Sequence, residues 1–498
     1  MKPARRRSHL DSTVFEKVHP MKHSLTQLAI LILVLPLVAA AQTSISLRSD
    51  ASLPSAAAPQ AVPSQSNSQV QPTTPSSPTP QPVPGNPTQL TLKQAEQLAI
   101  RNNPQISVAR LIALASEQVT REVRSNLWPT AGGEITGVGA QSGSRITAGA
   151  LNNPIIFERA AAGLVFSQLI TDFGRTNNLI SSANYAAKAE NENALATTQQ
   201  ILLAVNRAFY NALQAQAVLT VARQTVKERQ TVADQVGALY KSKLKSELDF
   251  SFANVNLAQA QLLLLDAENN RDAAQATLSM VLGFQTLQNF QLVDEPSPNQ
   301  PPASNVDDLI GQAFSARPEI RSLEFQYQSA RKFQVAERDL LFPTIRAMGA
   351  VGVTPVGDAA VAPSPVAFNN NYGAIGGNME IPLFNGFLYF ARAKEAKLRA
   401  QATDERLRDM RDLISRDVRT SWLNANTAFQ RLAVTQQLLD QAKLALNLAQ
   451  SRYNLGLGSI VELSQAQLQE TQAEIAYAQA GYDYRLSLAV LAYETTGI

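Results

Sequence analysis

Two stretches of this chain run for more than sixty residues without a glycine or a proline. Residues 175–236 contain neither over 62 positions, and residues 388–455 contain neither over 68. At about 1.5 Å per residue, a continuous helix of that length would extend roughly 90–100 Å. The average helix of a globular protein has only about 11–12 residues. The two runs therefore predict two very long helices, which cannot fold into one compact core.

Each run leads into a short stretch that carries turn signals and then into a second helical pattern. The first stretch is LYKSKLKSELDF at 239–250, and the second is RYNLGLGSIVEL at 452–463, 213 residues later. Gly456 and Gly458 allow backbone angles that other residues resist. We therefore expect two long helical hairpins, with these stretches as their tips.

The tips also contain helix-start signals. Ser459 followed by Glu462 fits a capping box, in which the serine and the acidic residue satisfy each other's backbone N–H groups. Ser246 followed by Asp249 is a looser version of the same pattern. On residue pattern alone, capping is one complete interpretation of these four residues, and a functional role is the other.

The chain repeats itself. The tripeptide PQI at 104–106 returns as PEI at 318–320, and the pair PT at 129–130 returns at 343–344, both with an offset of 214. Farther along, the offset is 213, so one residue is lost over about 130 positions, which is typical of an internal duplication. The predicted division is repeat 1 at 89–283, a linker at 284–304 and repeat 2 at 305–498.

Four shorter stretches show the alternation of a β-strand. In 344–353 the odd positions are Ile, Ala, Gly, Val and Val, and an arginine lies between them. This period of two gives one apolar and one polar face. The predicted strands are 130–140, 160–170, 344–353 and 372–381, with loops at 141–159 and 354–371.

The first 41 residues have the pattern of a secretory signal. A basic start at Met21-Lys22-His23 precedes an apolar run at 28–38 and three alanines at 39–41. Met21 is a second candidate for the start of translation, and a short membrane anchor is the alternative interpretation. Residues 42–88 are rich in Pro, Ser and Gln, which predicts a flexible, partly extended linker.

Composition argues against several classes of function. The chain has 43 basic and 40 acidic residues, and without residues 1–41 the counts are 37 and 38. The positive excess belongs to the leader, so we expect no nucleic-acid partner. There is no cysteine, and all three histidines lie in the leader. We therefore expect no disulfide, no His or Cys metal site, no Ser–His or Cys–His catalytic group and no cofactor.

The strands can be reconciled with a membrane only if chains associate. No apolar run of about 18 residues follows the leader, so the sequence predicts no transmembrane helix. Alternating strands can cross a membrane in a closed barrel, but four strands are too few, since the smallest known barrels have about eight. Transmembrane strands here would require several chains to share one barrel, and the long helices should likewise pack beside those of neighbouring chains.

A set of motifs occurs in order along residues 90–498. They are LTLKQAEQLAIRNNPQI at 90–106, LWPT at 127–130, TDFGR at 171–175, PLFNG at 382–386 and RYNLGLGSIVEL at 452–463. Together with the duplication, this set resembles the TolC-like outer-membrane efflux protein family, the outer membrane factors of tripartite efflux and type I secretion systems.

The resemblance implies a fold that is mainly α with a small β part. Three chains would form a helical α-barrel across the periplasm and a shared 12-stranded transmembrane β-barrel, to which each chain gives four strands. The implied localisation is the bacterial outer membrane, in contact with its lipid. The implied partners are two further copies of the chain, a periplasmic adaptor and an inner-membrane transporter, which supplies the energy for passive passage through the duct.

The resemblance also implies two sets of site residues at the tips. The adaptor contacts match at Leu244, Ser246, Arg452, Leu457 and Ser459. The periplasmic gate matches at Asp249, Glu462 and Tyr453. Such carboxylates, repeated around a threefold axis, would make an entrance that attracts cations.

Three positions depart from the family pattern. In the first tip, Leu239 stands where the family has an arginine, and Lys243 stands where it has a glycine. In the second tip, Gln465 replaces a second acidic residue of the gate. These departures weaken the expectation for adaptor contact at the first tip and for a strong acidic ring.

Two alternatives to an export duct belong to other classes. An exported structural coiled coil without a pore would explain the helices but not the four glycine-rich strands. An exported enzyme would need a cluster of catalytic or metal-binding side chains, and the many charged residues on long helices are more typical of a solvated face. We therefore expect a channel and not an enzyme.

Overall fold

The fold is that of a computed structural model, which describes residues 88–139, 159–294, 300–303, 305–357 and 371–496. The leader predicted at 1–41 and the linker predicted at 42–88, apart from Thr88, lie outside the described residues. Parts of the two predicted strand-connecting loops also lie outside them. The described chain is mainly helical with a small sheet, which confirms the fold class expected from the sequence.

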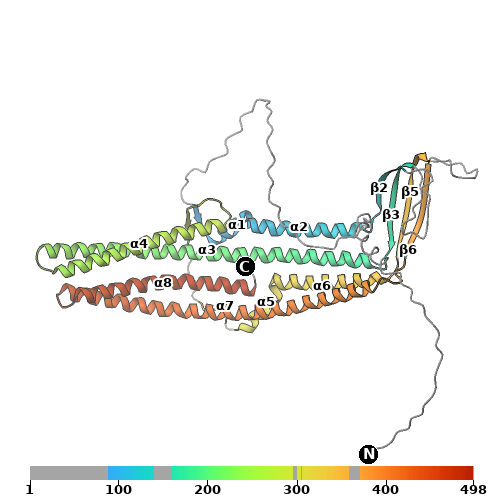
Figure 1. The fold of residues 1–498 in the computed structure, drawn as a ribbon. Coiled ribbons are helices and arrows are strands. Elements are labelled where there is room, and N and C mark those ends of the chain that lie inside the picture. The colour runs from blue at the N-terminus through green and yellow to red at the C-terminus, as the bar shows by residue number, and fades with distance from the viewer. Residues whose placement is uncertain (1–87, 140–158, 295–299, 304, 358–370, 497–498) are drawn as a thin grey trace, which may run out of the picture. The chain divides into compact units, whose positions relative to one another are not determined.

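Two very long helices dominate the described chain (Figure 1). Helix α3 spans Arg175–Lys241 and is followed by α4 at Glu247–Val281. Helix α7 spans Leu388–Asn454 and is followed by α8 at Ile460–Thr495. Each pair forms a helical hairpin, as predicted.

Helix α3 continues for more than a turn beyond the glycine-free run from which it was predicted. Gly237 lies inside the helix instead of ending it. A Cβ atom at Gly237 would come within 3.2 Å of the ring of Phe250 on α4. The glycine therefore lets the aromatic ring approach the helix backbone closely.

Four shorter helices precede the strands and the long helices in the two halves. They are α1 (Leu92–Asn102), α2 (Pro104–Ser125), α5 (Val306–Ala316) and α6 (Pro318–Arg338), and the 3-10 turn η1 (Asp339–Leu341) follows α6. Thr91 caps α1 in a full capping box with Gln94. In each half the proline at the first position of the second helix sets a bend, because proline favours a helix start and disfavours a helical residue before it.

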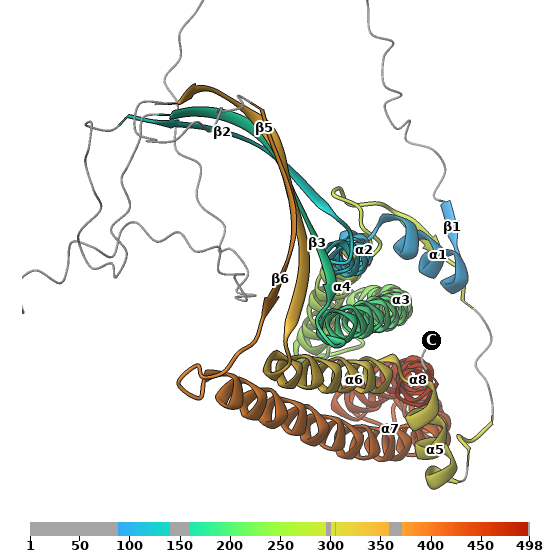
Figure 2. The ribbon, with the colours of Figure 1, turned by 90° about the vertical axis from the view of Figure 1, so that its right-hand side faces the viewer.

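The main sheet has four antiparallel strands in the order β2-β3-β5-β6. Their bounds are β2 Thr130–Val138, β3 Arg159–Thr171, β5 Thr344–Gly357 and β6 Asn371–Glu380. The two halves of the chain meet where β3 pairs with β5. The sheet curves strongly (Figure 2). All four strands were predicted, and β5 extends beyond its predicted end.

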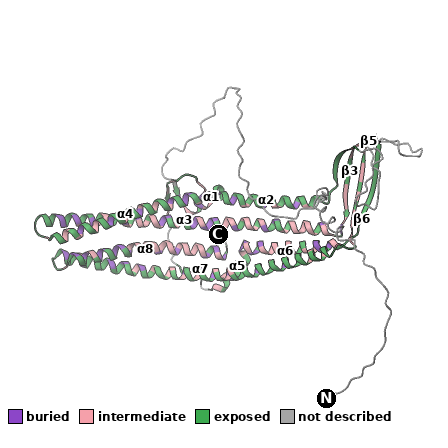
Figure 3. Cartoon of the chain, in the orientation of Figure 1, coloured by how far each residue is buried: buried purple, intermediate pink, exposed green. Residues whose placement is uncertain are grey.

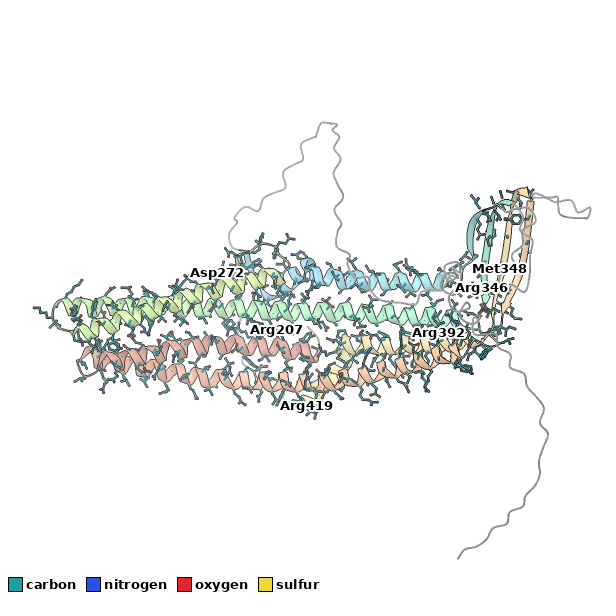
Figure 4. The ribbon with its side chains drawn as sticks, viewed as in Figure 1. Arg207, Asp272, Arg346, Met348, Arg392 and Arg419 are labelled. Carbon is teal, nitrogen blue, oxygen red and sulfur yellow. The ribbon has the colours of Figure 1, made fainter. Side chains whose placement is uncertain are left out.

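The two faces of this sheet differ in chemistry. One face, traced through the pairing register, carries large apolar side chains: Ile135, Leu164, Phe166, Val351 and Ile375. The other face is mixed, since it carries polar and charged side chains (Thr130, Glu134, Ser167, Arg346 and Asn378) beside Val165, Leu169 and Met348. Figure 4 labels Arg346 and Met348, which share this second face of β5.

A second, very small sheet was not predicted. Strand β1 (Thr88–Leu90) pairs in parallel with β4 (Phe290–Leu292). Leu90 and Leu292 are buried there in a cluster with residues of α1, α3 and α4. This pairing fastens the segment between the two halves to the start of the folded chain.

Helix α3 is the central packing element. It contacts α2, α4, α6 and α8, whereas α7 contacts α5, α6 and α8. Buried residues are interspersed with intermediate and exposed residues along the helices (Figure 3). Many of the buried residues are alanines, which permit close helix approach.

Across the described ranges, none of the helices has both the length and the apolar character required to span a membrane.

Candidate functional site: the tips of two helical hairpins

The two hairpin tips pack against each other. A buried cluster joins Val236 of α3 and Ala253 of α4 to Tyr453, Ile460 and Leu463 of the second hairpin. A side-chain hydrogen bond of 2.6 Å from Asn256 to Ser464 also links α4 to α8. The two tips predicted from the sequence thus form one structural unit.

The second tip is closed by backbone bonds around Arg452. The N–H groups of Leu457 and Gly458 both donate to the carbonyl oxygen of Arg452, at 2.8 and 3.1 Å. Gly456 has a φ of +73°, a conformation that glycine adopts without steric cost. The Arg452 guanidinium also lies 3.1 Å from the Glu462 carboxylate, so its charge is balanced within the tip.

The first tip has the same backbone turn with different residues. Leu244 donates its N–H to the carbonyl of Leu239 at 2.9 Å, as Leu457 does to Arg452. Lys243 occupies the position of Gly456 and keeps a positive φ of +61°. The ring of Tyr240 stacks on that of Phe250 with centroids 5.3 Å apart.

The helix caps differ from the sequence prediction. The full capping box forms at the first tip, where the Asp249 carboxylate accepts from the Ser246 N–H at 3.1 Å and Ser246 Oγ accepts from the Asp249 N–H at 3.1 Å. At the second tip, Ser459 accepts from the Glu462 N–H, but the Glu462 carboxylate turns to Arg452. The expectation that Ser459 and Glu462 form the better box was wrong, because a nearby arginine competes for the carboxylate.

Tyr453 is the buried residue of the predicted gate set. Its side chain is only 6% exposed, and its hydroxyl has no hydrogen-bond partner within the described residues. The Lys245 ammonium lies 3.9 Å from the centre of its ring. Burial raises the pKa of the Tyr453 hydroxyl, and the negative charge of Asp249 raises it further. Tyr453 and Asp249 are therefore close enough to interact electrostatically across the two tips.

The residues predicted to contact an adaptor lie on the outside of the tips. Leu244 and Leu457 are 71% and 70% exposed, far more than a leucine that serves a core. Ser246 and Ser459 cap α4 and α8, and Arg452 lies in the exposed turn. The structure thus brings together all eight predicted site residues at one end of the helices.

A buried charged cluster lies farther along the same helices and was not predicted. Arg229 of α3 is 5% exposed and donates to the carbonyl of Gln467 at 2.8 Å and to the hydroxyl of Thr471 at 3.1 Å, both on α8. Burial lowers the pKa of Arg229, although nearby carboxylates act in the opposite direction. The arginine ties the first hairpin to the second.

Carboxylates surround this arginine. Burial raises the pKa of Glu470, which is 7% exposed, to about 7, and the charges of Glu474 and Glu228 add to the shift. Lys443 of α7 lies 3.4 Å from Glu474. In the sequence, the signal for this cluster is that Arg229 stands where the other repeat has Ala442, and Glu470 where it has Leu257.

A sequence comparison identifies the wider class of the chain. The family profile described as "Outer membrane efflux protein" matches residues 95–284 and 309–493, which together make up most of the chain. The two matched stretches contain both long hairpins.

Individual proteins show the same likeness at low identity. The outer membrane protein TolC of Salmonella enteritidis is 22% identical over 418 residues, covering 81% of this chain and 82% of TolC. The probable outer membrane lipoprotein SilC of Salmonella typhimurium is 24% identical over 415 residues, covering 79% and 84%. A membrane protein from Pseudomonas aeruginosa of known crystal structure superposes with a TM-score of 0.70 at 19% identity, covering 82% of this chain and 93% of that protein.

Proposed function

Because the chain belongs to the outer membrane efflux protein family and is an outer-membrane efflux channel, we propose that three copies assemble into one continuous duct across the outer membrane and the periplasm. The resemblance and the localisation expected from the sequence are both confirmed by the family match. The trimeric assembly and its partner proteins remain proposals.

The observation that carries the proposal is the four-stranded sheet with two unlike faces. Strands β2 and β6 have no strand beyond them in the described chain, so each presents an open edge. Open edges in lipid leave backbone groups without partners, and closure across neighbouring copies removes this cost. Three copies give twelve strands, with the apolar face toward lipid and the polar face toward the lumen.

The long helices would extend the duct into the periplasm. Helices α3, α4, α7 and α8 from three copies would lie side by side around the same axis as the sheet, with the tips at the far end. We propose that a periplasmic adaptor docks at the tips through Leu244, Ser246, Arg452, Leu457 and Ser459. An inner-membrane transporter would drive substrates into the duct, which conducts them passively.

The gate would lie at the same tips. Tyr453 lies in the buried cluster between the paired tips, Asp249 accepts from the Ser246 N–H at the start of α4, and Glu462 pairs with Arg452. In a trimer, Asp249 and Glu462 would place six carboxylates around the entrance and favour the entry of cations. Tyr453 would hold the two hairpins together through its buried ring.

The first experiment measures the oligomeric mass of the purified protein in detergent together with its single-channel conductance in a planar bilayer. We expect a trimer that forms a cation-preferring pore. A monomer without a pore would contradict the shared duct. It would favour the structural coiled coil, the alternative against which the sheet and the family match argue.

The gate is tested by Glu462→Gln in the same bilayer. We expect a weaker cation preference, because three carboxylates leave the entrance, and a larger conductance, because Arg452 loses its partner within the tip. The matched control is Glu405→Gln, which removes an exposed carboxylate on α7 that pairs with Arg408. An unchanged cation preference in Glu462→Gln would remove this residue from the gate.

A further inference from the structure

The two tips differ in how their basic side chains are paired. At the second tip, Arg452 lies 3.1 Å from Glu462 and also reaches the carbonyl of Leu457 at 3.4 Å. Its positive charge is therefore neutralised inside the tip. The first tip has lost this arginine, since Leu239 stands in its place, and it carries lysines instead.

Three lysines occupy alternate positions of the first turn. Lys241, Lys243 and Lys245 stand where the second tip has Asn454, Gly456 and Gly458, none of which is charged. Lys241 and Lys243 are exposed, whereas Lys245 is half-buried over the ring of Tyr453. The duplication thus supplies an internal reference in which the same turn closes without any of these charges.

The lysines have no carboxylate partner of their own. Among the described residues, none of the ion pairs within 4.0 Å includes Lys241, Lys243 or Lys245. The closest acidic residues in sequence are Glu247 and Asp249, and Asp249 is occupied with the cap of Ser246. The exposed Lys241 and Lys243 therefore form no ion pair with a carboxylate in the described part of the chain.

The backbone of Lys243 shows that the first tip keeps a lysine where the turn favours a glycine. Its φ of +61° is a left-handed conformation that side-chain-bearing residues adopt at a cost. Gly456 meets the same requirement at +73° without that cost. The turn that ends α3 requires this conformation, since the Lys243 N–H donates to the Tyr240 carbonyl at 2.9 Å. The first tip thus keeps a lysine at a position where a glycine would cost less.

We propose that the first tip is a basic docking surface for acidic side chains of the protein that binds the tips, with Lys241 and Lys243 as its charged contacts. This inference rests on the proposed function, in which an adaptor docks there. It shifts the charged recognition from Arg452, which is already paired, to the first tip, where the sequence pattern had weakened the expectation.

The surface fits a protein partner because it combines charge with a fixed apolar side chain. Leu244 follows directly after Lys243 and is 71% exposed, and its N–H is held by the Leu239 carbonyl at 2.9 Å. A leucine held on a rigid turn and flanked by cations matches a shallow apolar pocket rimmed by carboxylates. A lipid headgroup layer would be recognised by the charges alone.

The test uses the full-length protein in intact cells and a zero-length carbodiimide cross-linker, which joins lysine amines to carboxylates in direct contact. Cross-linked peptides are then mapped by mass spectrometry. We expect Lys241 or Lys243 to be joined to an Asp or Glu of another exported protein. Cross-links confined to carboxylates of this chain would overturn the proposal.

A matched pair of variants measures the contribution of the charges. Lys241→Asn with Lys243→Gly gives the first tip the residues of the second, and Lys394→Asn with Lys397→Asn removes two exposed lysines from α7. We expect the first variant to lower the amount of co-purified partner identified by the cross-link about tenfold, as befits two ion pairs acting together, and the second to leave it unchanged. Equal co-purification with both variants would overturn the proposal.

Charge reversal and lipid binding complete the test. Lys241→Glu with Lys243→Glu should abolish docking, and exchanging the mapped partner carboxylates for lysine should restore it. Binding of the wild-type tips to phosphatidylglycerol vesicles, lost in the Lys241→Asn, Lys243→Gly variant, would assign the surface to lipid and overturn the protein partner. Trimer mass and conductance of every variant are measured in parallel, so that a failed duct is distinguished from a failed docking surface.

Discussion

The bend at Asn103 and the bend at Arg317 occupy equivalent places in the two halves, yet they are fastened by different chemistry. In the first half, the Asn103 amide donates to the backbone carbonyl of Val281, at the end of α4, at 2.9 Å. In the second half, Arg317 forms ion pairs with Glu319 at 2.9 Å and with Glu494, near the end of α8. Position 494 is the repeat equivalent of position 281.

The comparison shows that the backbone bends alike in the two halves, whereas different side chains hold the two bends in place. Both bends need a contact between the residue before a proline and the end of the second hairpin helix. A neutral amide is sufficient in one half, whereas the other half buries an arginine that also lies 5.0 Å from the ring of Tyr493. A buried ion cluster costs desolvation energy, and its members depend strongly on one another.

Breaking the arginine cluster is therefore expected to have the largest effect. Arg317→Met should destabilise the protein by about 3–5 kcal/mol, because the half-buried Glu319 and Glu494 would be left without a counter-charge. Asn103→Ala should cost about 1–3 kcal/mol, since it removes the hydrogen bond to the Val281 carbonyl and the cap bond from the Gln105 N–H. The measurement is the thermal unfolding midpoint of the detergent-solubilised protein, followed by circular dichroism.

A triple variant tests whether charge is the reason. Arg317→Met with Glu319→Gln and Glu494→Gln removes the whole cluster and should recover most of the loss. If Arg317→Met costs no more than Asn103→Ala, the two bends are energetically alike and the proposed difference between the halves is wrong.

The contact between the hairpins shows a second difference between the halves. Glu470 on α8 is buried beside Glu474 and near Arg229, whereas its repeat equivalent is Leu257. The first half thus places an apolar residue where the second half places a titratable one. The consequence is a dependence on pH that only the second half can introduce.

The direction of the pKa shift of Glu470 determines how the stability of the folded protein changes with pH. The pKa of Glu470 rises from its ordinary value of 4.5 to about 7 in the folded protein, mainly through burial. The folded state therefore holds a proton that the unfolded state has lost, and its stability falls as pH rises from about 4.5 to about 7. Glu470→Gln should remove this slope and stabilise the protein above pH 7 by roughly 1–3 kcal/mol.

The measurement is the thermal midpoint as a function of pH for the wild type and for Glu470→Gln. The control is Glu405→Gln, which removes an exposed carboxylate in the same repeat. It should leave the dependence of the thermal midpoint on pH unchanged. Parallel curves for wild type and Glu470→Gln would show that Glu470 does not titrate in this range.

Local patterns were sufficient to predict most of the fold. The absence of Gly and Pro, the turn residues and the strand alternation are all read within a few residues of one another, and they predicted the long helices, the tips and the four strands. The parallel pair β1 and β4 was missed because each strand has three residues and its partner lies about 200 positions away. A pattern that short carries no period.

The sequence predicted where the tips lie in the chain but not the contacts between their side chains. Arg229 and Glu470 meet only because α3 and α8 pack with one particular register, which no local pattern determines. Ser459 caps α8 as predicted, but the second bond of its capping box was predicted wrongly for a related reason. The carboxylate of Glu462 has two available partners, and the closing of the turn at Gly456 places Arg452 within reach.

The smallest expected effect comes from this difference between the caps. Ser246→Ala removes an acceptor from the Asp249 N–H and breaks a two-way capping box, and should cost about 1–2 kcal/mol. Ser459→Ala removes a one-way cap and should cost about 0.5–1 kcal/mol, because the Glu462 carboxylate keeps its separate bond to Arg452. Thermal midpoints of the two variants decide the order, with Ser451→Ala as a control inside α7, where the exposed hydroxyl donates to the Asn447 carbonyl of its own helix. If Ser459→Ala proves the more costly, the second tip depends on its cap more than on its arginine, and the assignment of Arg452 as an internal partner of Glu462 has to be reversed.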